Sequence, residues 1–320
     1  MFGFTQSSAC ALRVVASFMP PLLLTACIGV TRAPAPTAIP PDPPGALRVS
    51  AVGDIADCRH GSPAESMAAR TAALVPAGEI VLGLGDMAYQ HADAATLASC
   101  YEPTWGIHRG TTIAIPGNHD YVAGDASAFI DYFRPVSAPG AGFIAHTRRL
   151  TDHWLLVALD SNVSGSALEA QYRWLEESLA TERTRGDAQE CVLVMWHAPL
   201  YSSGLHRGSG DHLRRFWRLL DEYGADVVLS GHEHFYERFG PLDADGRVPP
   251  DGEAARQFVI GTGGTQLFGF WKPPYRSESR VLTHGVLKLS LAPAGYTWQF
   301  IDVDRRVRDA GQARCRAAAN

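Results

Sequence analysis

Short apolar runs alternate with segments suited to helices in the first half of the chain. Three of these runs end in glycine and a polar residue: LRVSAVGD, EIVLGLGD and TTIAIPGNHD. Continuous apolar runs of this length predict strands that are buried on both faces. Between the first two, SPAESMAARTAAL has the composition of a crossover helix, and Ser62 with Glu65 predicts a capping box at its start. The first half therefore predicts a β-α-β arrangement.

The second half continues this alternation and then changes to strands alone. Two neighbouring strands are predicted in GFIAHTRRLTDHWLLVALDSN, and a helix in SALEAQYRWLEESLA, with Ser166 and Glu169 as a capping box. A further strand, helix and strand are predicted in CVLVMWH, GDHLRRFWRLLDEYG and ADVVLSGHEH. The runs RQFVIGTGG, GVLKLSLAP and YTWQFIDV predict a mostly antiparallel ending. We expect one mixed α/β domain over residues 47–310, followed by a C-terminal tail over residues 311–320.

The N-terminus differs from the rest of the chain. Arg13 precedes VVASFMPPLLLTAC, an apolar stretch that is too short and too interrupted by proline for a membrane span, so residues 1–26 are expected to be a secretory signal. Its end, Leu24-Thr25-Ala26-Cys27, resembles the bacterial lipoprotein signal, which implies membrane attachment through a lipidated Cys27. Ordinary secretion, with Cys27 discarded or inert, remains the alternative. The Pro-rich segment that follows predicts an extended tether over residues 27–46.

These features predict an exported protein: a bacterial membrane-anchored lipoprotein, periplasmic or at the cell surface, or a secreted protein. Four cysteines follow the tether, and in an oxidising compartment they allow two disulfides with three connectivities. We favour Cys58 with Cys100 and Cys191 with Cys315, with free buried thiols as the alternative.

Composition narrows the choice of partner. The chain has 320 residues, of which 46% are hydrophobic, and this is ample for a sizeable core. Its formal net charge is -5 and it has no long basic stripe. Because binding to nucleic acid requires clustered Lys and Arg, no nucleic-acid partner is expected.

Polar residues gather just after the apolar strands, where open α/β sheets place their ligands. They supply carboxylate, amide, imidazole and phenol groups, a set of donors that suits two cations better than a thiolate site. These residues are Asp54, Asp86, Tyr89, Asn118, His119, Asp120, His197, His232 and His234.

The order of these motifs carries a resemblance. The motifs GD, GDxxY, GNHD, a histidine at a strand end and GHEH occur in the order typical of the calcineurin-like metallophosphoesterases. Most members of that superfamily have a histidine two residues after the first aspartate, whereas this chain has Ala56 there and Tyr89 after the second aspartate. That exchange is similar to the purple acid phosphatases, and the resemblance spans roughly residues 47–303. It implies an α/β fold, a four-layer α/β/β/α sandwich with two mixed β-sheets.

The resemblance also implies a role for each ligand. Asp54, Tyr89 and His234 would hold Fe(III), Asn118, His197 and His232 would hold a divalent metal (Fe, Zn or Mn), and Asp86 would bridge the two. A phenol binds metal as phenolate, which near neutral pH requires a strongly Lewis-acidic ion, and this supports iron(III). The implied activity is that of an acid phosphatase, a hydrolase that cleaves small phosphate monoesters with a metal-bound hydroxide.

Three residues of the site are expected to act without binding metal. Protonation of the leaving group and neutralisation of phosphate charge require donors that are not on metal, and His119 and His206 are the candidates. His206 lies in YSSGLHRG, and a solvent-exposed loop residue without a role is its alternative. We expect Asp120 to orient His119 and Asp57 to be an ordinary loop residue. The run LFGFWKPPYRSESR either rims the site or forms a surface loop.

Two alternatives to a monoesterase remain. The same site could act on phosphodiesters, pyrophosphate or nucleotides, because ligand motifs define the metal centre and not the pocket wall. A surface lipoprotein that retains metals and binds without catalysis belongs to a different class, and the complete ligand set counts against it. The sequence does not predict the oligomeric state.

Overall fold

The computed structural model describes residues 39–122, 124–134, 143–184, 191–206, 210–273 and 275–316. They belong to one compact unit, residues 37–320. The expected secretory signal, Cys27 and most of the tether lie outside the described residues. Among the described residues, no helix combines the length and the hydrophobicity that crossing a bilayer requires.

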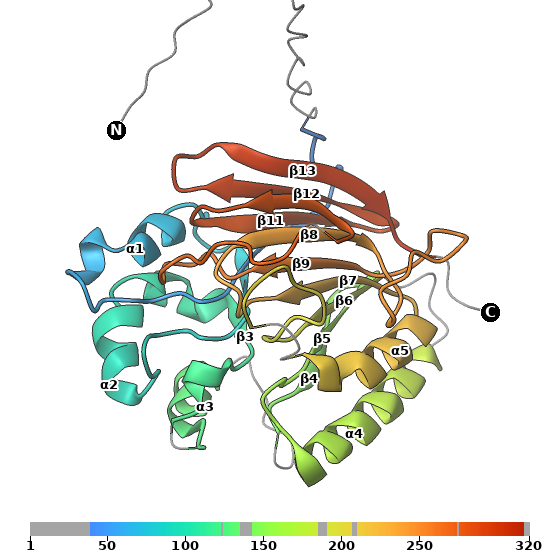
Figure 1. Cartoon of the computed structure of the whole chain (residues 1–320), viewed down its shortest axis with the longest axis horizontal. Coiled ribbons are helices and arrows are strands. Elements are labelled where there is room, and N and C mark those ends of the chain that lie inside the picture. Colours follow the sequence, from blue (N-terminus) through green and yellow to red (C-terminus); the bar gives the residue numbers. More distant parts are fainter. Residues whose placement is uncertain are drawn as a thin grey trace, which may run out of the picture. The chain divides into compact units, whose positions relative to one another are not determined.

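Two β-sheets form the centre of this unit (Figure 1). The described part of the first sheet has six strands in the order β13-β12-β11-β1-β2-β3. Their bounds are β1 Leu47–Val52, β2 Ile80–Gly83, β3 Thr112–Ala114, β11 Gly285–Ala292, β12 Gly295–Asp302 and β13 Val307–Arg314. β1, β2 and β3 are parallel, whereas β11 pairs antiparallel with β1, so this sheet is mixed.

The second sheet has seven described strands in the order β10-β8-β9-β7-β6-β5-β4. Their bounds are β4 His146–Thr151, β5 Trp154–Ala158, β6 Cys191–Met195, β7 Ala225–Ser230, β8 Tyr236–Pro241, β9 Arg256–Ile260 and β10 Ser277–Val281. β5, β6, β7 and β9 are parallel, and β4, β8 and β10 pair antiparallel, so this sheet is also mixed.

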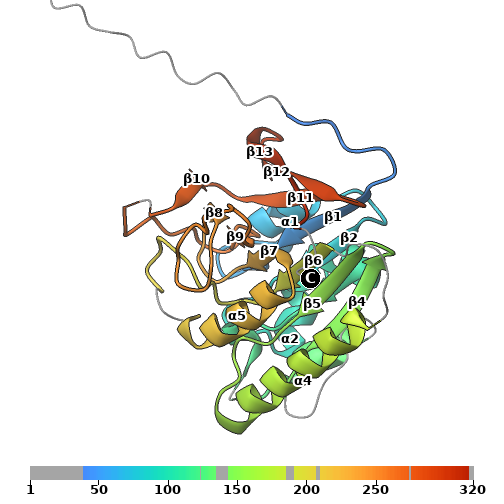
Figure 2. The same ribbon diagram turned by 90° about the vertical axis from the view of Figure 1, so that its right-hand side faces the viewer.

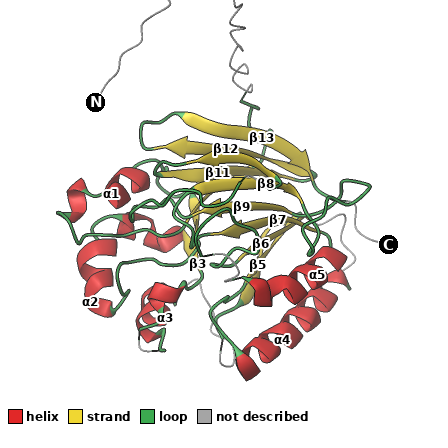
Figure 3. Cartoon of the chain, viewed as in Figure 1, coloured by secondary structure: helices red, strands yellow, loops and turns green. Residues whose placement is uncertain are grey.

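Helices cover the outer faces of both sheets (Figures 2 and 3). α1 Met67–Ala72, α2 Ala94–Thr96 and α3 Ser127–Phe133 lie on the side of the first sheet, and α4 Gly165–Arg183 and α5 Arg214–Glu222 on the side of the second. One apolar cluster joins Phe129 of α3 to Val81 of β2. A larger one joins strands of both sheets and α4, including Leu82, Leu193 and Leu175. The expected four-layer α/β/β/α sandwich with two mixed sheets is confirmed.

Both predicted capping boxes are wrong. α1 begins at Met67, because Ser62 opens only a short 3-10 turn and the Ser66 side chain accepts the cap hydrogen bond, from the amide of Ala69 at 3.2 Å. α4 begins at Gly165 after Ser164, which places Ser166 inside the helix.

The sheet also continues past the boundary that we expected at residue 310. β13 runs to Arg314, and Cys315 is bonded to β6, so most of the expected tail belongs to the folded domain. β13 has few apolar residues, and its partners hold it in the sheet instead. Asp309 accepts hydrogen bonds from Tyr236 at 2.6 Å, Arg238 at 2.7 Å and Trp298 at 3.1 Å.

Both favoured disulfides, Cys58–Cys100 and Cys191–Cys315, are confirmed. The first fastens the loop after β1 to the helical segment before β3. The second ties the start of β6 to Cys315, which follows β13, and so joins the two sheets.

We expect the Cys191→Ala, Cys315→Ala double variant to have a free energy of unfolding about 2–5 kcal/mol lower than that of the parent protein. The reason is that the disulfide it loses joins residues separated by 124 positions and so closes a long loop. Urea denaturation of the oxidised proteins measures this difference. The Cys58→Ala, Cys100→Ala variant is the matched control, since its loop separation is 42 residues and its loss should be smaller. A larger loss in the control would contradict the loop-entropy explanation.

Candidate metal centre

Parallel strands deliver the predicted ligands to one place. Asp54 follows β1, Asp86 and Tyr89 follow β2, and Asn118 follows β3 in the first sheet. His197 follows β6, and His232 and His234 follow β7 in the second sheet. The carboxyl ends of the two sets of strands meet at one edge of the sandwich, where the amide of Gly53 donates to the carbonyl of Ile260 and that of His232 donates to Asp54 Oδ2.

The glycines of these motifs allow the ligands to come this close. A Cβ atom at Gly117 would lie 2.1 Å from Asp86 Oδ1, and one at Gly231 would lie 2.6 Å from Asp54 Oδ2. The backbone is also constrained at three of the ligands: Asp54, Asp86 and His232 have φ values of 59°, 52° and 70°. Such left-handed conformations are uncommon outside glycine and concentrate at functional sites, where the surrounding structure holds them.

The Tyr89 hydroxyl is the meeting point of one half of the site. It lies 2.8 Å from Asp54 Oδ1, 2.8 Å from Asp86 Oδ2 and 3.2 Å from His234 Nε2. A phenol carries a single proton and can donate it to only one of the two carboxylates. A cation among these oxygen and nitrogen atoms would satisfy all of them.

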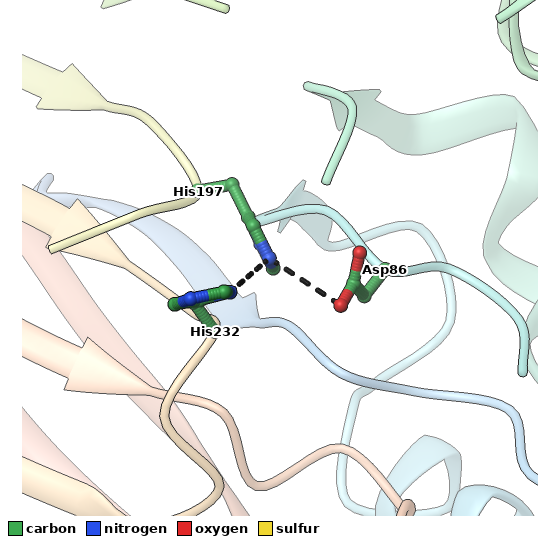
Figure 4. Close-up of side chains that lie close together, drawn as sticks. All are labelled: Asp86, His197 and His232. Carbon is green, nitrogen blue, oxygen red and sulfur yellow. Dashed lines mark hydrogen bonds and ion pairs between the residues drawn. The ribbon is translucent and has the colours of Figure 1, made fainter. Parts of the chain in front are cut away.

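His197 is the meeting point of the other half (Figure 4). Its Nε2 atom lies 3.4 Å from Asp86 Oδ2, 3.2 Å from Asn118 Oδ1 and 3.2 Å from His232 Nδ1. Asp86 Oδ2 therefore touches both halves of the site. The structure brings all seven predicted ligands into one connected cluster.

Two of the histidines are held as metal-binding histidines usually are. His197 Nδ1 lies 2.8 Å from the carbonyl oxygen of Leu84, and His234 Nδ1 lies 2.7 Å from that of Gln266. A carbonyl oxygen can accept a hydrogen bond only from a protonated Nδ1, so each ring, when neutral, presents the lone pair of Nε2 to the site. This tautomer fits a cation in each half.

The charges of the cluster also fit a cation. Burial favours protonation of Asp86, but the nearby rings of His197 and His119 outweigh it and hold the pKa of Asp86 below its ordinary value. Burial lowers the pKa of His197, yet the carboxylates of Asp86 and Asp54 raise it to about 10. The cluster therefore requires a compensating positive charge beside Asp86, which a cation supplies as well as a proton on His197 does.

A cavity of about 280 Å³ opens above these residues, a size that suits a small substrate. Sequence reasoning identified part of its wall: Asp86, Tyr89, Asn118, His119, His206, His232 and His234. It missed Arg59, Gln90, Thr265 and Gln266. Phe268 comes from the aromatic run and stacks on His234 at 4.4 Å between ring centroids, so this part of the run rims the site, whereas Trp271 and Tyr275 are exposed.

His119 lies where the resemblance places it, but the expected role of Asp120 is wrong. His119 lines the cavity, and its Nδ1 atom lies 2.5 Å from the carbonyl oxygen of Gln90, which orients the ring. Asp120 instead accepts hydrogen bonds from backbone amides, those of Asp86 and Gly117 at 2.7 Å and of Met87 at 3.1 Å. It thus holds the Asp86 loop in place. Burial and the charge of Asp86 raise the pKa of Asp120 to about 7.

His206 also lies at the cavity, packed against His232 with 4.9 Å between ring centroids. Glu233, between two predicted ligands, holds it there. One carboxylate oxygen of Glu233 accepts from the His206 amide at 2.9 Å, and the other lies 3.4 Å from His206 Nδ1. The sequence contained a signal for this contact, because Glu233 is a charged residue between His232 and His234, two predicted metal ligands in the GHEH motif.

A family model described as calcineurin-like phosphoesterase matches residues 47–236, more than half of the chain. Purple acid phosphatase 22 of Arabidopsis thaliana is 35% identical over 129 residues, which cover 37% of this chain and 28% of that protein. Phosphoenolpyruvate phosphatase of Allium cepa is 27% identical over 270 residues, which cover 72% of this chain and 54% of that protein. The chain thus spans about half or less of the length of these relatives.

The solved structure of purple acid phosphatase PPD1 from yellow lupin (Lupinus luteus) seeds superposes with a TM-score of 0.61 at 16% identity. The superposition covers 86% of this chain and 55% of that one. At this identity the likeness shows the shared fold. The family-model match, together with relatives that are purple acid phosphatases, confirms the resemblance seen in the motifs, and the chain belongs to the calcineurin-like phosphoesterase family.

Proposed function

We propose that the protein is an exported, metal-dependent phosphatase that hydrolyses small phosphate monoesters at a dinuclear centre of the purple acid phosphatase type. The family and the named relatives imply a dinuclear metal site. One observation carries the finer proposal: the Tyr89 hydroxyl lies within 2.8 Å of both Asp54 and Asp86 and 3.2 Å from His234. A phenol at the centre of two carboxylates and an imidazole is a ligand set for a strongly Lewis-acidic ion.

Each half of the cluster fits one ion. Asp54, Tyr89 and His234 would hold Fe(III). Asn118, His197 and His232 would hold a divalent ion (Fe, Zn or Mn), and Asp86, which touches both halves, would be shared. The chemistry that two such ions supply when bound is Lewis-acid activation of water and of a phosphoryl oxygen.

Two histidines of the chain complete the proposal. The Gln90 carbonyl occupies Nδ1 of His119, so Nε2 is the atom that remains to donate a proton to the leaving oxygen or to a phosphoryl oxygen. Glu233 occupies Nδ1 of His206 in the same way. His206 lies at the cavity beside the buried carboxylate of Glu233, where its imidazole can donate a hydrogen bond to a phosphate oxygen.

Export and a membrane anchor through Cys27 belong to the same proposal. The two disulfides support export, because disulfides persist in oxidising compartments.

Hydrolysis of three substrates by the metallated protein tests the proposed reaction. We expect p-nitrophenyl phosphate to be hydrolysed with a larger kcat/KM than bis(p-nitrophenyl) phosphate, and both activities to disappear after metal chelation. Faster hydrolysis of the diester, or of pyrophosphate alone, would replace the monoesterase with one of the other phosphoesterase activities. A protein that binds phosphate and hydrolyses none of the three would contradict the proposal and support a binding role.

A further inference from the structure

Arg59 is the only arginine or lysine among the described residues that line the cavity. It follows Asp54 by five positions, in the loop after β1, and lies outside the ligand motifs described above. Phosphates and carboxylates are the groups that arginine binds best, because its planar fork of N–H donors matches their oxygens. A lone guanidinium on the wall of a proposed phosphatase site therefore requires an explanation.

The Arg59 side chain is fixed in place. Its Nε atom donates to Asp57 Oδ1 at 2.8 Å and its Nη2 atom to Asp57 Oδ2 at 2.5 Å. Asp57 is in turn held by the Thr265 hydroxyl at 3.1 Å, and the Cys58–Cys100 disulfide lies between the two residues in the chain. Asp57, which we expected to be an ordinary loop residue, is thus the support of a cavity residue. A side chain held this way loses little further entropy on binding a ligand.

The pairing with Asp57 leaves donors free. Hydrogen bonds to Asp57 use Nε and one N–H of Nη2, and Nη1 has no hydrogen-bond partner among the described residues. The hydrogen bonds with Asp57 also raise the pKa of Arg59 above its ordinary value, so the guanidinium is permanently charged.

The position of Arg59 between the floor and the mouth of the cavity indicates which part of a substrate it would contact. The side chains of His197 and Asp86 are 0% and 2% exposed, so the expected metal ligands form the floor. Arg59 is 36% exposed, similar to His119 at 33% and His206 at 39%, so these three stand at the mouth. A phosphoryl group on the floor must direct its leaving group toward the mouth.

We propose that Arg59 forms a second anion subsite at the mouth of the cavity, which selects phosphate esters and anhydrides whose leaving group carries its own negative charge. A carboxylate or a second phosphate close to the scissile bond would meet the free donors of the guanidinium. This inference rests on the proposed phosphatase function and specifies the substrate class.

Two substrates that differ by one charge test the subsite kinetically. We expect Arg59→Gln to lower kcat/KM for 3-carboxyphenyl phosphate by about 10- to 100-fold, the effect of losing a charged hydrogen bond, and that for phenyl phosphate by less than about threefold. Arg134→Gln is the matched control, because Arg134 is exposed at the end of α3, does not line the cavity and should change neither value. Equal losses for both esters would overturn the subsite and assign Arg59 to the phosphoryl group or to loop structure.

Binding of phosphonates that the enzyme cannot hydrolyse tests the subsite independently of catalysis. By calorimetry on the metallated protein, we expect Arg59→Gln to weaken the binding of methylenediphosphonate about 10- to 100-fold. The binding of methylphosphonate should hardly change. If the parent protein hydrolyses neither ester, the proposed function fails, and these two ligands still decide the role of Arg59. Unchanged affinity for methylenediphosphonate would overturn the inference.

Discussion

Asp86→Ala is expected to lose both metals and to lower kcat/KM by at least about 10³-fold. Removal of one preorganised electrostatic group already lowers kcat by about 10² to 10³, and Asp86 is part of both halves of the site. Its Oδ2 atom lies 2.8 Å from the Tyr89 hydroxyl and 3.4 Å from His197 Nε2. Elemental analysis of the purified variant measures the metal content, and hydrolysis of an aryl phosphate measures the activity.

The controls separate metal loss from misfolding. Asp86 Oδ1 also accepts a hydrogen bond from the His119 amide at 2.8 Å, so an alanine can disturb the loop as well as the site. Asp86→Asn keeps the shape and removes the charge. Asp226→Asn is the matched control, because Asp226 is also a buried carboxylate that accepts backbone amides, from Val192 at 2.7 Å and Arg316 at 2.6 Å, outside the site. Full occupancy of both metals in folded Asp86→Asn and Asp86→Ala would contradict the shared role.

Tyr89→Phe is expected to abolish any visible absorption of the oxidised protein and to weaken retention of the ion in that half of the site. Removal of a side chain that only supports a metal ligand already lowers metal affinity about 10- to 100-fold. Tyr89 would bind the metal itself, so its loss should have at least this effect. A spectrum recorded at known iron content, before and after dialysis against a chelator, measures both effects. The ring remains, so packing against His119 at 4.6 Å is retained.

Tyr121→Phe provides the comparison for this variant. Tyr121 lies three residues after Asn118, and its hydroxyl donates to the buried carboxylate of Asp160 instead of lining the cavity. We expect this substitution to leave colour and iron content unchanged. A visible band that persists in Tyr89→Phe, or disappears in Tyr121→Phe, would assign the absorption to another group.

The parts of the fold and site that could be predicted are those with a local signature. A strand that is buried on both faces appears as a continuous apolar run, and a glycine followed by a polar residue marks where it ends. Asp54 and Asp86 follow this pattern, and the parallel pairing of β1 and β2 brings them together. The glycines at the strand ends allow the ligands to approach one another as well as the chain to turn, because a Cβ atom at Gly117 would clash with Asp86.

The parts that could not be predicted depend on distant partners. β13 has little apolar character, and it is held because Asp309 meets Tyr236 and Arg238 of β8, residues more than 70 positions away in the sequence. Arg59 and Asp57 have the composition of an exposed loop, and only the folded chain places Thr265 beside Asp57. Asp120 was predicted to serve His119, its neighbour in the sequence, whereas backbone amides of the Asp86 loop compete for its oxygens more successfully.

The most direct test of the iron-phenolate centre is elemental analysis combined with a visible spectrum of the oxidised native protein. The proposed site predicts iron and a second metal ion in each chain, and a pink to purple colour from the Tyr89 phenolate bound to Fe(III). A colourless protein that is fully metallated and active on aryl phosphates would contradict it.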